Sequence, residues 1–94
     1  MTTAQIILNQ IKAQDKMALW AWGARDYVNT GNGIQFRVNG SNTKRGSWCK
    51  ITLNGKDLYD IEIYRIYKAD IKTDSTANDV YADMLIQILD ELIG

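Results

Sequence analysis

Three Asn-Gly pairs punctuate the middle of the chain, and they restrict its fold more than any other feature of the sequence. The pairs are Asn32-Gly33, Asn39-Gly40 and Asn54-Gly55. Both residue types tolerate the positive φ angles of tight hairpin turns, and the segments between the pairs alternate apolar and polar residues. The pattern therefore predicts an antiparallel meander, in which each strand turns back beside the one before it.

The alternation predicts four strands and a short fifth one. Their expected ranges are 25–30, 33–39, 47–54, 57–67 and, for the short strand, 69–72. One face of the sheet is apolar, and its residues are Ile34, Phe36, Val38, Cys49, Ile51, Leu53, Tyr59, Ile61 and Ile63. The other face is polar but includes Trp48 and Tyr64. We expect the apolar face to pack on a core while the polar face meets solvent.

Helical spacing marks the N-terminal segment. Apolar residues recur from Ala4 to Ile11 after Thr2 or Thr3, either of which is suited to the N-cap, so we expect a helix over residues 3–14.

Residues 17–24 are almost wholly apolar and include Trp20 and Trp22. Periodicity allows either a short helix or an irregular buried segment here. In both cases we expect the two indoles in the core, because large aromatic side chains fill the cores of small domains.

The C-terminal segment has the strongest helical pattern. Asp74 or Ser75 is suited to the N-cap, and a broad apolar stripe follows. The stripe consists of Ala77, Val80, Tyr81, Met84, Leu85, Ile88 and Leu92 and is widened by Ile86, Leu89 and Ile93. We expect Met84 and Ile88 to be core residues. The sequence therefore predicts one α+β domain over residues 1–94, with a meander, an N-terminal helix and a long amphipathic C-terminal helix.

Charge is sorted along the chain, although the formal net charge is zero. Residues 1–50 carry seven Lys or Arg and two Asp or Glu, whereas residues 51–94 carry four and nine. Local patches, rather than the total, set the field that a phosphate or a charged protein meets. Charge on one part of the surface is therefore the best indication of a partner.

The composition disfavours several classes of protein. The chain has no His, and Cys49 is its single Cys, so the usual metal sites, the commonest general base and an internal disulfide are missing. No stretch approaches the roughly 18 apolar residues of a membrane helix, and the N terminus lacks the pattern of a signal peptide. We expect a cytoplasmic protein with no cofactor, metal or membrane partner.

The segment 37–50 is the candidate ligand site, because it carries four positive charges and no negative one. Its relevant residues are Arg37, Lys44, Arg45, Trp48 and Lys50. Phosphates would contact the basic side chains while a base or sugar stacks on the indole. The alternative is a solvated hairpin whose charges protect a sheet edge.

Asp60 and Glu62 project from the same face of one predicted strand, with Lys50 nearby. Such a group resembles part of a nuclease metal site, but that chemistry needs further carboxylates and no Glu-x-Lys follows. Cross-strand ion pairs with Arg37 and Lys50 explain the two carboxylates more simply. Cys49 lies on the apolar face, where we expect it to be a small core residue.

The apolar arc of the predicted C-terminal helix is wider than one sheet face covers. Ile86, Leu89 and Ile93 lie at its margin and are flanked by Asp83 and Asp90. These residues predict contact with another chain, either a second copy of this protein or a basic host protein.

Four phrases of the sequence resemble small proteins of about this length that are encoded by phages, prophages and gut bacteria and have no assigned function. The phrases are AWGAR (21–25), GIQFRVNG (33–40), ITLNGKDLYD (51–60) and DVYADML (79–85). The resemblance implies a mobile-element setting, in which small proteins occupy a host protein or sequester a small ligand. We therefore expect a non-enzymatic, phage-associated binding protein, such as an inhibitor of a host defence protein. The alternative is a nucleic-acid or nucleotide-binding module.

Overall fold

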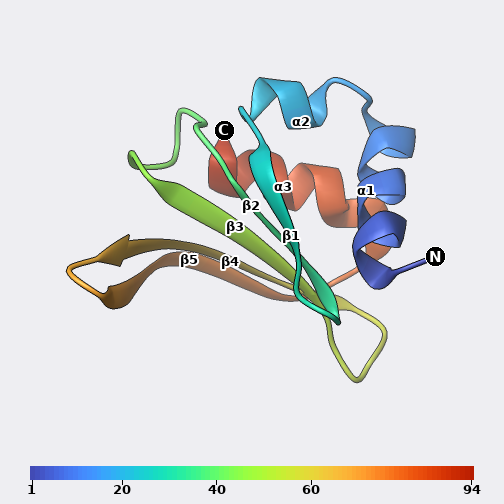
Figure 1. Ribbon diagram of the computed structural model, residues 1–94. Helices are drawn as coiled ribbons and strands as arrows, with labels where there is room; N and C mark the ends of the chain where they lie inside the picture. The colour runs from blue at the N-terminus through green and yellow to red at the C-terminus, as the bar shows by residue number, and fades with distance from the viewer.

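A five-stranded antiparallel sheet with helices on one of its faces forms the protein (Figure 1). The structure is a computed structural model and describes all residues, 1–94. The strands are β1 (Arg25–Asn29), β2 (Gly33–Arg37), β3 (Ser47–Leu53), β4 (Tyr59–Tyr67) and β5 (Asp70–Val80), and they lie in the order of the sequence. The predicted α+β class and the antiparallel meander are therefore confirmed.

The helices lie at both ends of the chain. They are α1 (Thr3–Gln14), α2 (Ala18–Ala21) and α3 (Leu85–Ile93), and a single 3-10 turn, η1 (Ala82–Met84), precedes α3. The Thr2 hydroxyl accepts a hydrogen bond from the Gln5 amide at 3.2 Å, and the Gln5 side chain accepts one from the Thr2 amide at 2.9 Å. This capping box fixes the start of α1. None of the helices has the length and hydrophobicity that a bilayer crossing requires.

One hydrophobic core fills the space between the sheet and the helices. Its largest fully buried side chains are Ile7, Ile11, Trp22, Ile34, Phe36, Ile51, Ile61, Ile63, Leu85, Leu89 and Ile93. Cys49 is buried with them, as expected, and burial raises the pKa of its thiol. Because three helices and four strands contribute to one cluster, each helix depends on the sheet for its position.

The segment after β4 differs from the prediction. Residues 70–80 form a long strand, whereas the sequence predicted a short strand over 69–72 and a helix from Asp74 or Ser75 onward. The second edge of β4 needs backbone partners, and β5 supplies them along its whole length through pairs such as Ile61 with Ala77. The C-terminal helix is accordingly short.

The β4–β5 hairpin extends beyond the other strands at one end of the sheet (Figure 1). Its turn consists of Lys68 and Ala69, which both have positive φ angles, 49° and 68°. Two consecutive residues of this conformation make a tight turn that matches the twist of the strands. Neither position is Gly or Asn, the residues that favour positive φ angles, so the sequence does not predict this turn.

The segment between β2 and β3 is not a tight hairpin, although the Asn39-Gly40 pair predicted one. Residues 38–46 form a loop that folds back onto the C-terminal end of α3. The Asn42 amide donates to the carbonyl of Ile93 at 2.9 Å, and the Asn42 side chain donates to the carbonyl of Glu91 at 3.2 Å. The loop thereby satisfies carbonyl groups that the helix end leaves free.

The two neighbouring tryptophans have opposite environments. Trp22 is buried, and its indole N–H donates to the Asp90 carboxylate on α3 at 2.7 Å. Trp20 is 78% exposed on α2, so its expected core position is wrong. A helix of four residues buries one side only, here through Ala18.

Candidate functional site

The face of the sheet opposite the helices carries a row of large side chains. Arg37, Trp48 and Tyr64 are successive register partners on β2, β3 and β4. The Arg37 guanidinium lies 5.4 Å from the centre of the Trp48 ring, a cation–π arrangement, and 3.9 Å from the Asp26 carboxylate. The structure thus joins two of the predicted ligand residues in direct contact.

A hollow of about 200 Å³ lies beside this row. Its lining residues are Gln35, Lys50, Glu62, Tyr64 and Ile71. Tyr64 is only 7% exposed, and its hydroxyl donates to the side-chain oxygen of Gln35 at 3.1 Å. Burial raises the pKa of Tyr64, and the negative charge of Glu62 adds to this effect, so the phenol remains a donor.

The expected ion pairs of Asp60 and Glu62 are not formed. Lys50 and Glu62 are direct register partners, but no ion pair joins them. Glu62 accepts a hydrogen bond from the Thr73 hydroxyl at 2.6 Å. Asp60 accepts from the Asn54 side chain and from the backbone of Asp79, both at 3.1 Å.

These hydrogen bonds give Asp60 a role in the structure. They hold the turn between β3 and β4 against β5 near Val80, and Lys56 adds an ion pair with Asp79 at 3.2 Å. No group of three or more His, Cys, Asp and Glu side chains is placed to hold a metal ion.

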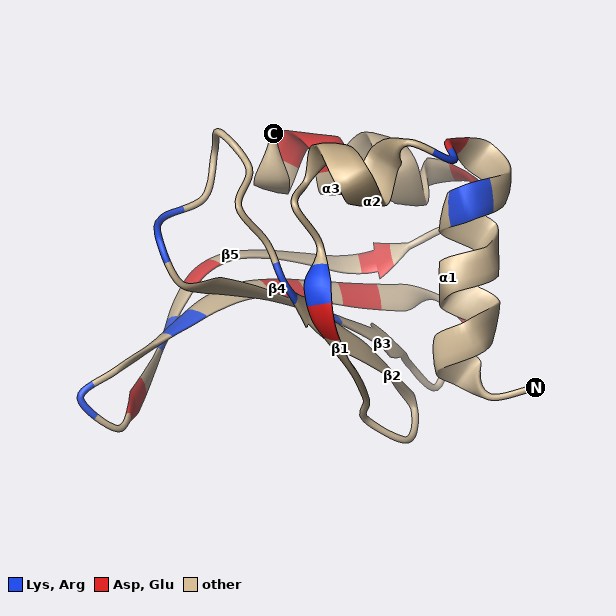
Figure 2. Ribbon diagram, turned by 45° about the horizontal axis from the view of Figure 1, so that its top comes forward, with Lys and Arg blue, Asp and Glu red and all other residues tan.

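Lys and Arg positions cluster along the backbone at one end of the sheet, where β2 and β4 end and β1, β3 and β5 begin (Figure 2). The seven residues of this basic end are Arg25, Arg37, Lys44, Arg45, Arg65, Lys68 and Lys72. Three acidic residues share this end, namely Asp26, Asp70 and Asp74. Since the whole chain carries 11 Lys or Arg and 11 Asp or Glu, the basic end has an excess of positive charge and the remainder an equal excess of negative charge.

Two of the seven cations have acidic partners. Arg65 donates two hydrogen bonds to Asp74, at 2.7 and 3.0 Å, and these hold the pKa of that carboxyl below its usual value. Arg37 has the longer contact with Asp26. The other five form no ion pair, which leaves their charge available to a partner.

The tip of the β4–β5 hairpin adds an exposed aromatic residue to the basic end. Tyr67 is half exposed, and the ammonium groups of Lys68 and Lys72 lie 5.4 and 5.1 Å from its ring centre. On the other face of the hairpin, Ile66 and Ile71 form an exposed cross-strand pair.

The predicted ligand residues are therefore partly assembled. Arg37, Trp48 and Lys50 share the open face of the sheet, and Lys44 and Arg45 are exposed in the adjoining loop. The sequence prediction missed Arg25, Lys68, Lys72, Gln35 and Tyr64 as site residues. Strand parity already indicates that Gln35 and Tyr64 share this face, but the ends of β4 and β5 could not be placed without the hairpin turn.

The interface predicted on the C-terminal helix is wrong for its two principal residues. Leu89 and Ile93 are 0% exposed within the monomer, because α3 lies against the sheet and is covered further by α1 and α2. Ile86 is partly buried against the same core. Asp90 is the hydrogen-bond partner of Trp22, whereas Asp83 is exposed in η1.

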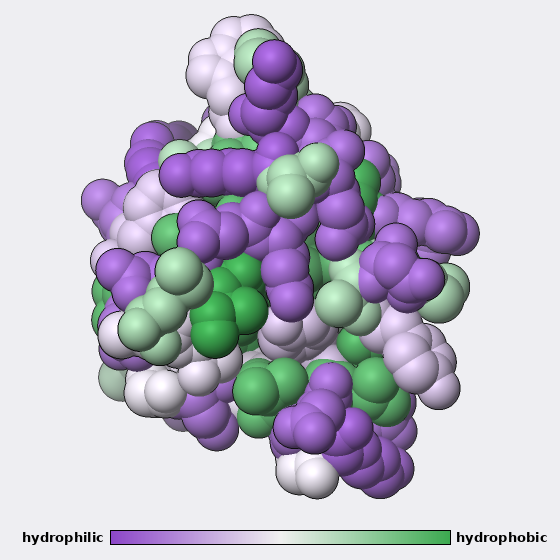
Figure 3. Space-filling view, turned by 90° about the vertical axis from the view of Figure 1, so that its right-hand side faces the viewer, coloured by the Kyte–Doolittle hydropathy of each residue, from purple (hydrophilic) through white to green (hydrophobic).

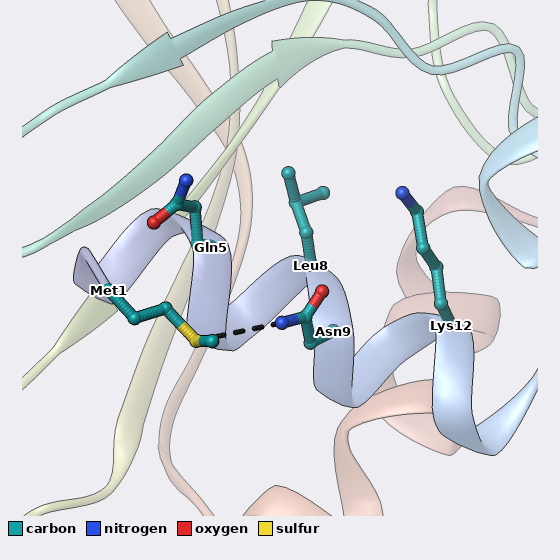
Figure 4. Close-up of a pocket in the computed structure, with 5 residues that line it drawn as sticks. All are labelled: Met1, Gln5, Leu8, Asn9 and Lys12. Carbon is teal, nitrogen blue, oxygen red and sulfur yellow. Dashed lines mark hydrogen bonds between the residues drawn. The ribbon is translucent and has the colours of Figure 1, made fainter.

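The largest surface hollow, about 470 Å³, lies along α1 and has different chemistry. Its side chains are Met1, Gln5, Leu8, Asn9 and Lys12, of which Gln5, Leu8 and Lys12 point the same way (Figure 4). The molecular surface on this side is a mixture of polar side chains and small apolar patches (Figure 3). One Lys among neutral residues offers little selectivity, so we place the candidate site on the open face and the basic end.

No protein-family model matches the chain, and no curated protein and no solved structure is significantly similar to it. The fold and the site define a small α+β protein with an open sheet face and a charged end.

Proposed function

We propose that the protein is a non-catalytic binding protein that binds a nucleic acid through its basic end. The observation that carries this proposal is the clustering of seven Lys and Arg residues at one end of the sheet, together with Trp48 on the open face and the exposed Tyr67 on the opposite face of the β4–β5 hairpin. Cationic side chains neutralise phosphates and release counterions, and aromatic rings stack on bases.

The distribution of charge supports this partner over a protein bound at α3. A chain with a formal net charge of zero attracts a polyanion only through a local excess of positive charge. The basic end supplies that excess. By contrast, Leu89 and Ile93, the apolar residues expected to contact a host protein, are buried in the core of the monomer. Inhibition of a host by a phage-associated protein, which the sequence resemblance implies, is compatible with binding to the nucleic acid of either organism.

Replacement of Lys44 and Arg45 by Glu tests the proposal. We expect the parent protein to bind labelled single- or double-stranded oligonucleotides at low salt, with an affinity that falls as salt rises. The variant should bind much more weakly and with a flatter salt dependence, because each lost phosphate contact removes about 0.7–0.9 units of log–log slope.

The matched control is replacement of Lys12 and Lys16 by Glu, which changes the net charge equally but at the C-terminal end of α1 and in the segment before α2, away from the basic end (Figure 2). This control should bind as the parent does. No binding by the parent protein at low salt would contradict the proposal and favour a host protein as the partner.

A further inference from the structure

We propose that the hollow on the open face of the sheet receives one base of a bound single strand and selects guanine. This inference rests on the proposed function, since the strand is held by the basic end. The residues that carry it are the five that line the hollow, with Lys50 and Glu62 as the selective pair.

The size and position of the hollow suit one base. Cavities that hold whole drug-sized ligands measure about 300–1,000 Å³, whereas this one measures about 200 Å³. It therefore fits a fragment of a longer ligand. It lies next to the row of Arg37, Trp48 and Tyr64, so a strand with phosphates on the basic end can place a base in it.

The lining combines apolar surfaces with hydrogen-bonding groups that still have free capacity. The side chain of Ile71, which is 67% exposed, offers an apolar surface on which a base can pack, and the nearly buried Tyr64 forms the floor of the hollow. Gln35 accepts the Tyr64 hydroxyl through its oxygen, which leaves its amide N–H groups as donors. Lys50 and Glu62 face each other without an ion pair, and one oxygen of Glu62 accepts from Thr73.

Guanine matches this arrangement better than the other bases. Its Watson–Crick edge presents two adjacent donors, N1–H and the N2 amino group, beside the acceptor O6. A carboxylate binds two adjacent donors in a bidentate, charge-assisted manner, and an ammonium group donates to O6. Adenine, cytosine and thymine each present only one N–H position on this edge beside acceptors, so they use one oxygen of Glu62 at most. In a duplex this edge is already paired, which is why the site reads a single strand.

The experiment compares short oligothymidines that differ in one central base. We expect the oligonucleotide with a central guanine to bind about tenfold more tightly than those with adenine, cytosine or thymine there, as measured by fluorescence anisotropy. Glu62→Gln keeps the size of the side chain and can still accept from Thr73, but it replaces one of the two acceptor oxygens by an NH2 donor, so the bidentate contact with N1–H and the N2 amino group is lost. It should remove the guanine preference and leave the salt dependence unchanged.

Two further variants make the result decisive. Lys50→Met should also reduce the guanine preference, because it removes the donor to O6 without touching Glu62. Glu91→Gln, an exposed Glu on α3, is the matched control and should keep the preference.

Equal affinity for all four central bases, or a preference that survives in Glu62→Gln, would overturn the inference while the proposed function stands. Absence of oligonucleotide binding at low salt would overturn both.

Discussion

Gly40 is the residue on which the packing of the 38–46 loop against α3 depends. A Cβ atom at this position would overlap the carbonyl oxygen and the side chain of Ile93. Gly40→Ala should therefore lower the free energy of unfolding, by about 1–3 kcal/mol, because either the loop or the helix end must shift. Chemical denaturation monitored by tryptophan fluorescence measures this change.

Gly55→Ala is the control for this prediction. A Cβ atom at Gly55 meets nothing within 4 Å, so the substitution should change stability by about 0.5 kcal/mol or less. Equal effects of the two substitutions would show that the loop does not need close contact with α3.

The sequence predicts on which face of the sheet a strand residue lies, but it does not predict how far the side chain is buried. Parity placed Trp48 on the polar face and Cys49 on the apolar one, and both placements are confirmed. Depth depends on neighbours from other elements. Tyr64 is nearly buried on the open face because its neighbours on the sheet surround it, and Trp20 is exposed because no element covers that side of α2.

At the scale of elements, the apolar stripe predicted for the C-terminal helix differs from the face that α3 buries. Leu89 is fully buried, whereas Met84, expected in the core, is 40% exposed. Leu89→Ala should therefore lower the free energy of unfolding by about 2–5 kcal/mol, through lost burial and the cavity left behind. Met84→Ala should cost about 1 kcal/mol or less. Thermal or chemical unfolding of both variants provides the comparison.

A larger loss of stability in Met84→Ala than in Leu89→Ala would instead support the helix predicted from the sequence, in which Met84 is a core residue. A second check is the oligomeric state of Leu89→Ala by light scattering, which should equal that of the parent if this side chain serves only the monomer core.

The prediction of a long C-terminal helix is wrong because residues 74–85 fit both a helical pattern and a strand pattern. Ala77, Val80, Tyr81 and Met84 recur at helical spacing, and this hides the fact that Ser75 and Ala77 also alternate with exposed neighbours. Tertiary pairing decides between the two, since β4 offers an open edge of nine residues. Local periodicity contains no information about that edge, so β5 could not be predicted in full. By contrast, α1 carries its own cap signal, and its predicted bounds are confirmed.

At the scale of the whole molecule, the meander places charged residues from both halves of the chain at the same end of the sheet. The basic and acidic halves of the chain do not become two halves of the structure, because successive strands run in opposite directions and bring residues of both halves to each end of the sheet. Arg65, Lys68 and Lys72 come from the acidic half and still lie at the basic end. The asymmetry of charge was evident in the sequence, but its place in space required the strand ends and the β4–β5 turn.

Separated charge should make the protein bind a phosphate-bearing cation exchanger at a slightly alkaline pH, although its sequence isoelectric point is about 6.1. At about 0.1 M ionic strength the Debye length is roughly 10 Å, shorter than each principal extent of the molecule, 34 × 27 × 21 Å. The resin therefore meets the basic end without much influence from the acidic remainder. Lys68→Glu combined with Lys72→Glu should abolish retention, whereas Lys12→Glu combined with Lys16→Glu should preserve it. Equal loss in the two double variants would mean that net charge alone governs binding and that the basic end does not act as a separate surface.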